Sequence, residues 1–246
     1  MKNNSAKILV MVIFIGLTSF KFGLFIDENS IVAPIYNKGT FWMIKYEKFT
    51  TKTSSGEVSV YTTNHSCYIN KSMKFNDIEA YEMTFLKNDE GAVKVFIDSS
   101  NLSLIGMIDP RKNYNDTLSI YFELLNFPLF TGKKWESMSQ LQESARRPIL
   151  NYNVVYNVSS IRDTIFFIES EEIKTKAYKI RADFTRNNKK YHSEYVYLAP
   201  NKTFPGSCPL FLYWQFDKNS TLITENRNIK YEYTSFYKQP ITNFNW

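Results

Sequence analysis

Apolar and polar residues alternate along most of the chain from about residue 38 onward. In the clearest example, AYKIRADF at residues 177–184, every second residue is apolar and the residues between them are Lys179, Arg181 and Asp183. Alternation of this kind places one face of a β-strand in the core and the other in water. The same period recurs in four further segments, residues 41–49, 80–86, 117–124 and 228–236. The pattern predicts half-buried strands of antiparallel sheet.

Short segments rich in Asn, Asp, Gly, Pro and Ser separate these runs, as is typical of turns between strands. Neighbouring strands twist by about 20–25°, so a long run of hairpins has to curl. We therefore predict a mainly β single domain over residues 27–246, built as a large curved antiparallel meander sheet or open half-barrel. Its apolar face needs a cover, which a helix, another sheet or a bound apolar ligand would supply. The candidate helix is residues 137–147, whose apolar stripe is thin.

Residues 1–26 begin with basic residues, and Ile8–Phe20 then form an apolar run. This layout is typical of an export signal and predicts one N-terminal hydrophobic helix before the β domain. No Ala-x-Ala cleavage pattern follows, so two readings stay open: a cleaved signal peptide, or a membrane anchor formed by residues 8–26. Either reading predicts an extracytoplasmic protein that is secreted, periplasmic or anchored to the outer face of the cytoplasmic membrane. A buried core helix is the alternative to export.

Composition agrees with a sheet protein. Aromatic residues make up 17% of the chain, whereas only 8 residues are Gly, which suits pleated surfaces better than glycine-dependent nucleotide loops. The formal net charge of +6 falls to +3 without residues 1–26, because three lysines and no acidic residue leave with them. The remaining basic residues are scattered beside turns, so we expect no nucleic-acid partner.

Sequons and cysteines fit an extracytoplasmic chain. Beyond the leader, the pattern Asn-x-Ser/Thr occurs at Asn64, Asn70, Asn101, Asn115, Asn157, Asn201 and Asn219. In a host that glycosylates, these asparagines would mark surface positions. Cys67 and Cys208 would form a disulfide in an oxidising compartment, with two buried free thiols as the alternative. Because the two residues are far apart in the sequence, the bond would stabilise the fold by roughly 4–5 kcal/mol through the entropy of the unfolded chain.

Motifs for catalysis or metal binding are sparse. His65 can share a strand face with Cys67, but no second pair of ligands completes a metal site, so we expect no metal and no other cofactor. His192 stands beside a serine and a glutamate in YHSEY, but neighbours along a strand point to opposite faces and do not form a catalytic triad. The acidic run IESEEIK fits a solvated turn better than a pair of catalytic carboxylates. We therefore predict that the chain is not an enzyme, with an exported hydrolase as the minor alternative.

One break in the alternation, NFPLFTGKKWE at residues 126–136, gathers a proline, a glycine, two lysines and a tryptophan. Pro128 cannot continue a central strand, and Gly132 permits a backbone turn. Trp135 then returns the chain to the apolar layer. We interpret this segment as a strand-to-strand crossover with an aromatic anchor, not as a catalytic loop.

The same segment resembles the Pro-Leu-x-x-Gly-x-x-Trp signature of the DUF3108-like family, a group of exported bacterial and archaeal proteins with a domain of unknown function. Two later segments, AYKIRADF and LYWQFDKNSTLITEN, resemble strands of that family, and the resemblance covers roughly residues 38–238. The segment ESEEIKTKAY departs from the Pro-Ala-Gly-Thr-like turn of the family. The resemblance implies a curved antiparallel sheet like that of periplasmic lipoprotein carriers, and it implies no activity or catalytic residue.

The surplus of aromatic strand residues without covering helices indicates a concave sheet face that binds an apolar ligand, a lipid chain or a partner. The candidate lining residues are Trp42, Tyr178, Ile180, Tyr213 and Trp214. The leading hypothesis is a non-enzymatic envelope or secreted protein that uses this face for binding. The alternative is a structural or interaction protein without a cavity, tethered to the membrane by residues 8–26.

Overall fold

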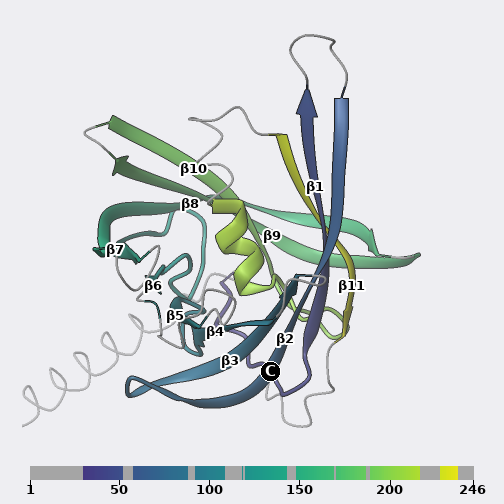
Figure 1. Cartoon of the computed structure of the whole chain (residues 1–246), viewed down its shortest axis with the longest axis horizontal. Helices are drawn as coiled ribbons and strands as arrows, with labels where there is room; N and C mark the ends of the chain where they lie inside the picture. Colours follow the sequence, from purple (N-terminus) through teal and green to yellow (C-terminus); the bar gives the residue numbers. More distant parts are fainter. Residues whose placement is uncertain are drawn as a thin grey trace, which may run out of the picture. The chain divides into compact units, whose positions relative to one another are not determined.

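The computed structural model describes most of the chain beyond the leader (Figure 1). The described residues are 30–51, 58–87, 92–108, 118, 120–142, 148–168, 170–186, 189–216 and 228–237. Residues 31–246 form one compact unit. Residues 1–26 lie outside the described ranges, so the signal peptide and the membrane anchor both stay predictions.

The first sheet has six strands in the order β11-β1-β2-β3-β4-β5. Their bounds are β1 Phe41–Thr51, β2 Val58–Phe75, β3 Ile78–Lys87, β4 Ala92–Asp98, β5 Leu104–Ile108 and β11 Asn228–Tyr237. The second sheet has five strands in the order β10-β9-β8-β7-β6. Their bounds are β6 Ile120–Tyr121, β7 Lys134–Leu141, β8 Leu150–Ile168, β9 Glu171–Arg186 and β10 Lys189–Leu198. Neighbouring strands in both sheets pair antiparallel.

Strands β1 to β10 follow one another along a single meander, and β11 returns to pair with β1. Leu104 of β5 exchanges two backbone hydrogen bonds with Phe122, next to β6, at 2.9 and 3.1 Å, and Met107 forms a bridge with Leu118. The mainly β, antiparallel and curved fold is therefore confirmed, and neither sheet closes into a barrel. The difference from the predicted single sheet lies at β6, whose two residues are too few for a continuous ladder. The ribbon divides into two sheets at this position.

The alternation in residues 177–184 predicted the two faces of β9 correctly. Tyr178, Ile180 and Ala182 are at most 1% exposed, and they belong to one hydrophobic core to which both sheets contribute. Lys179, between them, is exposed and pairs with Glu194 of β10 at 2.7 Å. The sheet thus presents its apolar face to the other sheet and its charged face to water.

Within the described residues, one helix is present, at residues 209–216, and it lies between the two sheets (Figure 1). Pro209 is its first residue, a position where the missing N–H of proline is tolerated. The carbonyl oxygen of Cys208 accepts hydrogen bonds from the backbone N–H groups of Phe211 at 3.0 Å and Leu212 at 3.2 Å, which starts the helix.

Two predictions of local structure were wrong. The segment LYWQF, residues 212–216, was expected to be a strand from the family resemblance, but it is helical. A helix that is apolar nearly all round is stable where core surrounds it, and both sheets surround this one. Residues 137–141 of the candidate helix lie in β7 instead, where the buried Trp135 and Ser139 alternate with the exposed Glu136 and Met138.

The crossover at residues 126–136 runs from Asn126 into β7. Gly132 has a φ of 81°, and its N–H donates to the carbonyl oxygen of Val158 at 2.9 Å, so the turn uses the left-handed region that glycine tolerates. Lys133 is half-buried and donates to the carbonyl oxygen of Pro128 at 2.9 Å. Trp135 is 8% exposed and stacks on Tyr156 with 5.0 Å between ring centroids.

Candidate functional site

The five candidate ligand-face residues lie inside a packed core. Trp42, Tyr178 and Ile180 are at most 1% exposed. Tyr213 and Trp214 are half-buried on the helix and pack against the same core. The structure thus brings all five residues into one hydrophobic cluster, but a segment of the chain that includes Tyr213 and Trp214 covers the other three. The cover is residues 204–216, which we call the interior segment.

Hydrogen bonds attach the interior segment to the first sheet. The indole N–H of Trp42 on β1 donates to the carbonyl oxygen of Gly206 at 2.9 Å. The hydroxyl of Tyr36, just before β1, donates to the backbone carbonyl oxygen of Ser207 at 3.3 Å. The ring of Trp214 lies 5.3 Å from His65 on β2 and 5.0 Å from Phe85 on β3. The first sheet therefore holds the interior segment by polar contacts at its start and by aromatic contacts at its end.

The second sheet holds the same segment along the free edge of β10. The backbone N–H of Val196 donates to the side-chain oxygen of Gln215 at 3.1 Å, and the amide nitrogen of Gln215 donates back to the Val196 carbonyl at 3.3 Å. The N–H of Leu198 donates to the Ser207 hydroxyl at 2.8 Å, and the Ser193 hydroxyl donates to the carbonyl of Phe216 at 3.0 Å. These contacts satisfy an edge that would otherwise be open for pairing with another chain.

Cys67 and Cys208 meet where the interior segment crosses β2. Both side chains are fully buried thiols. Burial raises the pKa of the Cys67 thiol well above its ordinary value, and a hydrogen bond with Cys208 and the nearby Cys208 sulfur raise it further. The two residues that sequence reasoning paired are therefore in contact, and they join segments 141 positions apart in the chain.

A pocket of about 360 Å³ opens where the two sheets meet, and we call it the junction pocket. It is lined by Phe75, Asn76, Ile78, Ile105, Leu118, Ile120, Tyr121 and Gln140. These residues come from the β2–β3 turn, from β5 and from the neighbourhood of β6 and β7. No residue of this lining was a candidate in the sequence, because the lining assembles only when the ends of the two sheets come together.

The polar groups of the junction pocket are uncharged. Among the described residues that line it, the hydrogen-bonding side chains are the amides of Asn76 and Gln140 and the hydroxyl of Tyr121. The Tyr121 hydroxyl donates to Glu123 at 3.3 Å. Burial raises the pKa of Tyr121, and the negative charge of Glu123 and its hydrogen bond raise it further, so the phenol stays neutral. The pocket therefore offers an apolar wall with neutral donors and acceptors, next to a negative charge.

Gly106, next to the pocket residue Ile105, explains how one pocket wall is formed. Phe75 and Phe96 stack with 4.1 Å between ring centroids. A Cβ atom at Gly106 would lie 2.6 Å from the end of the Phe75 ring and 3.3 Å from the Phe96 ring. A larger residue at position 106 would therefore have to displace the Phe75 ring, which lies directly on the backbone of β5.

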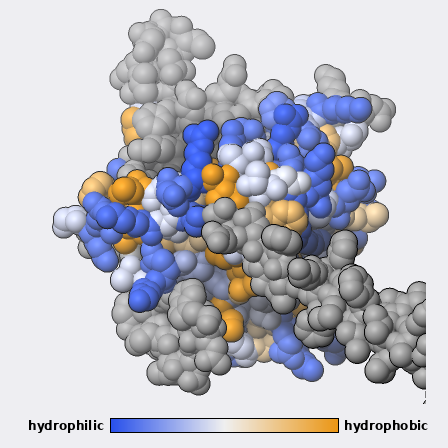
Figure 2. Space-filling model, turned by 180° about the vertical axis from the view of Figure 1, so that it is seen from behind, coloured by the Kyte–Doolittle hydropathy of each residue, from blue (hydrophilic) through white to orange (hydrophobic). Residues whose placement is uncertain are grey.

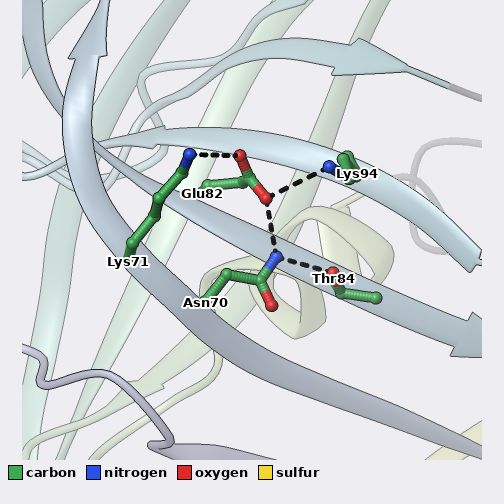
Figure 3. Close-up of polar contacts among 5 residues, drawn as sticks. All are labelled: Asn70, Lys71, Glu82, Thr84 and Lys94. Carbon is green, nitrogen blue, oxygen red and sulfur yellow. Dashed lines mark hydrogen bonds and ion pairs between the residues drawn. The ribbon is translucent and has the colours of Figure 1, made fainter.

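A polar cluster lies on the face of the first sheet that is turned away from the core of Tyr81 and Met83 (Figure 3). Glu82 of β3 has a side chain that is 10% exposed and forms ion pairs with Lys94 at 3.4 Å and Lys71 at 3.6 Å. The side-chain amide of Asn70 donates to Glu82 at 2.9 Å and to Thr84 at 2.7 Å. Burial alone raises the pKa of the Glu82 carboxyl, but the Asn70 hydrogen bond and the two lysines outweigh it and lower the pKa below its ordinary value. The cluster is a satisfied ion-pair network, which gives it a structural role.

The residues weighed as catalytic candidates do not form a site in the described part of the chain. His192 is exposed on one face of β10, whereas Ser193 is buried on the other and donates to the interior segment. Glu171 and Glu172 are exposed, and Glu172 pairs with Lys174 at 2.7 Å. Within the described ranges, no group of three or more His, Cys, Asp or Glu side chains is placed to hold a metal ion.

Several sequon asparagines have structural roles. Asn201 accepts hydrogen bonds from the backbone N–H groups of Thr203 at 2.8 Å and Phe204 at 2.7 Å, and Asn101 accepts one from Ser103 at 2.9 Å. These are Asx turns, which favour the same Asn-x-Ser/Thr spacing as a sequon. Asn64 is exposed on β2. Asn70 and Asn157 are half-buried, and Asn115 and Asn219 lie outside the described residues, so glycosylation stays a prediction.

Exposed apolar side chains are spread over several elements. On the face seen in Figure 2, hydrophobic surface occurs in separate patches among hydrophilic ones. The most exposed large apolar residues are Val32, Phe167, Ile35, Ile165 and Met138. In the ranges that the structure describes, no helix has the length and apolar character needed to cross a membrane.

Comparisons with known proteins add no relative. A scan against family models found no match, and searches of curated proteins and of solved structures found none either. The resemblance to the DUF3108-like family therefore stays a prediction from the sequence.

Proposed function

We propose that this chain is an exported, non-catalytic binding protein that holds an uncharged apolar ligand in the junction pocket. The observation that carries the proposal is the pocket, with its volume of about 360 Å³ and a lining that combines five apolar side chains with three uncharged polar ones. Ligand sites in proteins typically have volumes of about 300–1,000 Å³ and combine apolar walls with a few polar groups. The concave face predicted from the sequence is filled by the interior segment, so the binding site moves to the junction of the sheets.

The walls suit a medium-length alkyl chain. Phe75, Ile78, Ile105, Leu118 and Ile120 present only carbon to the space between them. Burying roughly 200 Å² of alkyl surface there would contribute about 5 kcal/mol before the costs of association. Taken alone, that gain corresponds to a Kd of about 0.2 mM, so the costs of association and ordering leave binding in the millimolar range or weaker.

The polar groups select the end of the ligand. Asn76 and Gln140 each carry a donor and an acceptor, which suit a hydroxyl, ester or amide group. A carboxylate would lie near the negative charge of Glu123 without a basic residue among the described lining residues. An alcohol should therefore bind better than the carboxylate of equal chain length.

Titration calorimetry on the full-length protein tests this proposal, with dodecan-1-ol and dodecanoate as probes. We expect saturable binding of dodecan-1-ol and at least tenfold weaker binding of dodecanoate. The blocking variant is Ile78→Trp, because Ile78 is 37% exposed at the pocket and can accept a larger ring without disturbing the core. The matched control is Ile165→Trp, on an exposed position of β8 that does not line the pocket.

Loss of dodecan-1-ol binding in Ile78→Trp, with binding kept in Ile165→Trp, would support the pocket. Equal binding in both variants would reject it. Absence of binding to the unmodified protein would favour the second candidate function, a structural or interaction protein without a ligand. The packing of the interior segment against both sheets is the observation that favours this second candidate.

Export through the leader is part of the proposal, and the sequence of residues 1–26 supports it. Fractionation of native cells tests it, with the chain expected outside the cytoplasm. Retention in membranes after a carbonate wash would support the anchor formed by residues 8–26, whereas release would support a cleaved signal peptide. Recovery of the chain from the cytoplasm would contradict export.

A further inference from the structure

Cys67 and Cys208 bring two reactive side chains from distant segments together inside the described core. Cys67 lies on the core face of β2, and Cys208 precedes the helix of the interior segment. Their thiols lie within hydrogen-bonding reach of one another. A bond there would fasten the interior segment to the first sheet next to the hydrogen bond between Trp42 and Gly206.

A metal does not explain the pair. Two thiols would supply half of a tetrahedral zinc site, and His65 lies two residues from Cys67 on the same core face. The His65 ring instead lies against Phe85 and Trp214, at 5.2 and 5.3 Å between ring centroids. In the described residues no third ligand joins the two cysteines.

We propose that Cys67 and Cys208 form a structural disulfide that locks the interior segment over the concave face. The proposal rests on the proposed export for its oxidant, a protein or small-molecule disulfide of an oxidising compartment. The thiolate of one cysteine attacks a sulfur of that donor and forms a mixed disulfide. The thiolate of the other cysteine then attacks the protein sulfur of the mixed disulfide. The donor leaves with two electrons as a pair of thiols, which take up the two protons that the cysteines lose.

Burial sets the time at which the bond can form. In the folded protein both sulfurs are inaccessible to solvent, and burial keeps the pKa of Cys67 high, so a folded and reduced chain reacts slowly. The bond therefore forms while the interior segment is docking. Once formed, it lies out of reach of reductants in solution, which makes it a lock and not a redox switch.

Refolding of the full-length chain tests the lock without reference to its location in the cell. Reduced, denatured protein is refolded in a mixture of reduced and oxidised glutathione, and free thiols are alkylated in denaturant before mass spectrometry. We expect no alkylated cysteine before reduction and two after it, together with a linked peptide pair that contains Cys67 and Cys208. Two alkylated thiols per chain in the refolded sample before reduction would overturn the proposal. A disulfide between two chains would also overturn it.

Variants separate the lock from general packing. Cys208→Ser should leave one thiol that can be alkylated, and its Tm should be lower than that of the unmodified protein. Reductant present during unfolding should not change the Tm of this variant further. The Tm of the unmodified protein should fall when reductant is present during unfolding, because unfolding exposes the disulfide to it. The double variant Cys67→Ala with Cys208→Ala should not show this response. An equal response to reductant in the unmodified protein and the double variant would contradict the disulfide. If the refolded chain forms the bond but native cells hold the protein in the cytoplasm, export fails and the pairing stands.

Discussion

Replacing Glu82 by glutamine removes one buried charge and keeps the shape of the side chain. The carboxylate has a side chain that is 10% exposed, accepts a hydrogen bond from Asn70 at 2.9 Å and pairs with Lys94 at 3.4 Å and Lys71 at 3.6 Å (Figure 3). Glutamine can still accept the hydrogen bond from Asn70, but as a neutral acceptor. The variant therefore isolates the contribution of the charge.

The expected cost is about 1–2 kcal/mol at pH 7. Both lysines are more than half exposed, so each ion pair contributes at most about 1 kcal/mol. Changing a charged acceptor to a neutral one weakens the Asn70 hydrogen bond by roughly 0.5–1 kcal/mol. The folded protein thus loses about 1–2 kcal/mol relative to the unfolded chain, in which residue 82 is solvated in either variant.

The pH dependence gives the prediction a second, independent outcome. The network lowers the pKa of Glu82 in the folded protein below its ordinary value of 4.5. A lowered pKa stabilises the fold above the unfolded pKa, and this stabilisation is lost as the pH falls through the folded pKa. The difference in unfolding free energy between the parent and Glu82→Gln should therefore be full at pH 7 and shrink toward zero at acidic pH, where both side chains are neutral.

Urea unfolding followed by tryptophan fluorescence measures this difference between pH 7 and pH 3. The matched control is Glu79→Gln, on the same strand, because Glu79 and its partner Lys74 are about 70% exposed and pair at 3.5 Å. The control should change the unfolding free energy by less than about 0.5 kcal/mol. The reasoning is refuted if the two variants cost the same at pH 7, or if the cost of Glu82→Gln does not change with pH.

Three further substitutions test the packing, each by its effect on urea unfolding. Gly106→Ala should lower the free energy of unfolding by about 1–2 kcal/mol, because the new Cβ would lie 2.6 Å from the Phe75 ring and has to displace it. An unchanged urea midpoint would show that the ring moves freely. Trp42→Phe should lower the free energy of unfolding by about 2–4 kcal/mol, because it removes the buried donor to Gly206 and leaves a void. A loss below about 1 kcal/mol would mean that the interior segment is held loosely. Gly132→Ala should cost about 1–2 kcal/mol from its φ of 81° alone, since the space around it is open; a neutral result would exclude backbone strain at this turn.

Period-two alternation correctly identified segments of β1, β3, β9 and β11. In residues 117–124, however, the described strand β6 spans only Ile120–Tyr121, and β7 lies where a helix was expected. In residues 177–184 the alternation identified both faces of β9, because each face of that strand has one environment, core or water. The alternation places Glu79 and Glu82, three residues apart, on opposite faces of β3, but it gave no warning that Glu82 is nearly buried whereas Glu79 is exposed. They differ because Asn70, at a bulge in β2, and Lys94 on β4 come close to one carboxylate and not to the other.

The interior segment could not be predicted from local pattern. Its helix is apolar nearly all round, so its short apolar run has no helical periodicity and resembles a strand. Pro209 was the signal in the sequence for a helix start, but Pro205 and Gly206 just before it indicated only a turn. The cover of the concave face also depends on contacts with β1, β2 and β10, which are brought together only by the complete fold.

The junction pocket was beyond sequence reasoning for a related reason. Its lining residues extend from Phe75 to Gln140 and come from strand ends and turns, where alternation carries little information. The aromatic residues that seemed most suited to a ligand serve the core instead. Trp42, Tyr178 and Ile180 are buried because the two sheets and the interior segment need a filled space between them.

A crystal structure of the protein soaked with 12-bromododecan-1-ol tests the binding site most directly, because anomalous scattering locates the bromine independently of the protein atoms. We predict one bromine peak between Ile105, Leu118 and Ile120, with the hydroxyl end within hydrogen-bonding distance of Gln140 or Asn76. A peak between Trp42 and Tyr178, with the interior segment displaced, would contradict the account and restore the concave face as the site. An empty junction pocket at saturating probe would contradict ligand binding there.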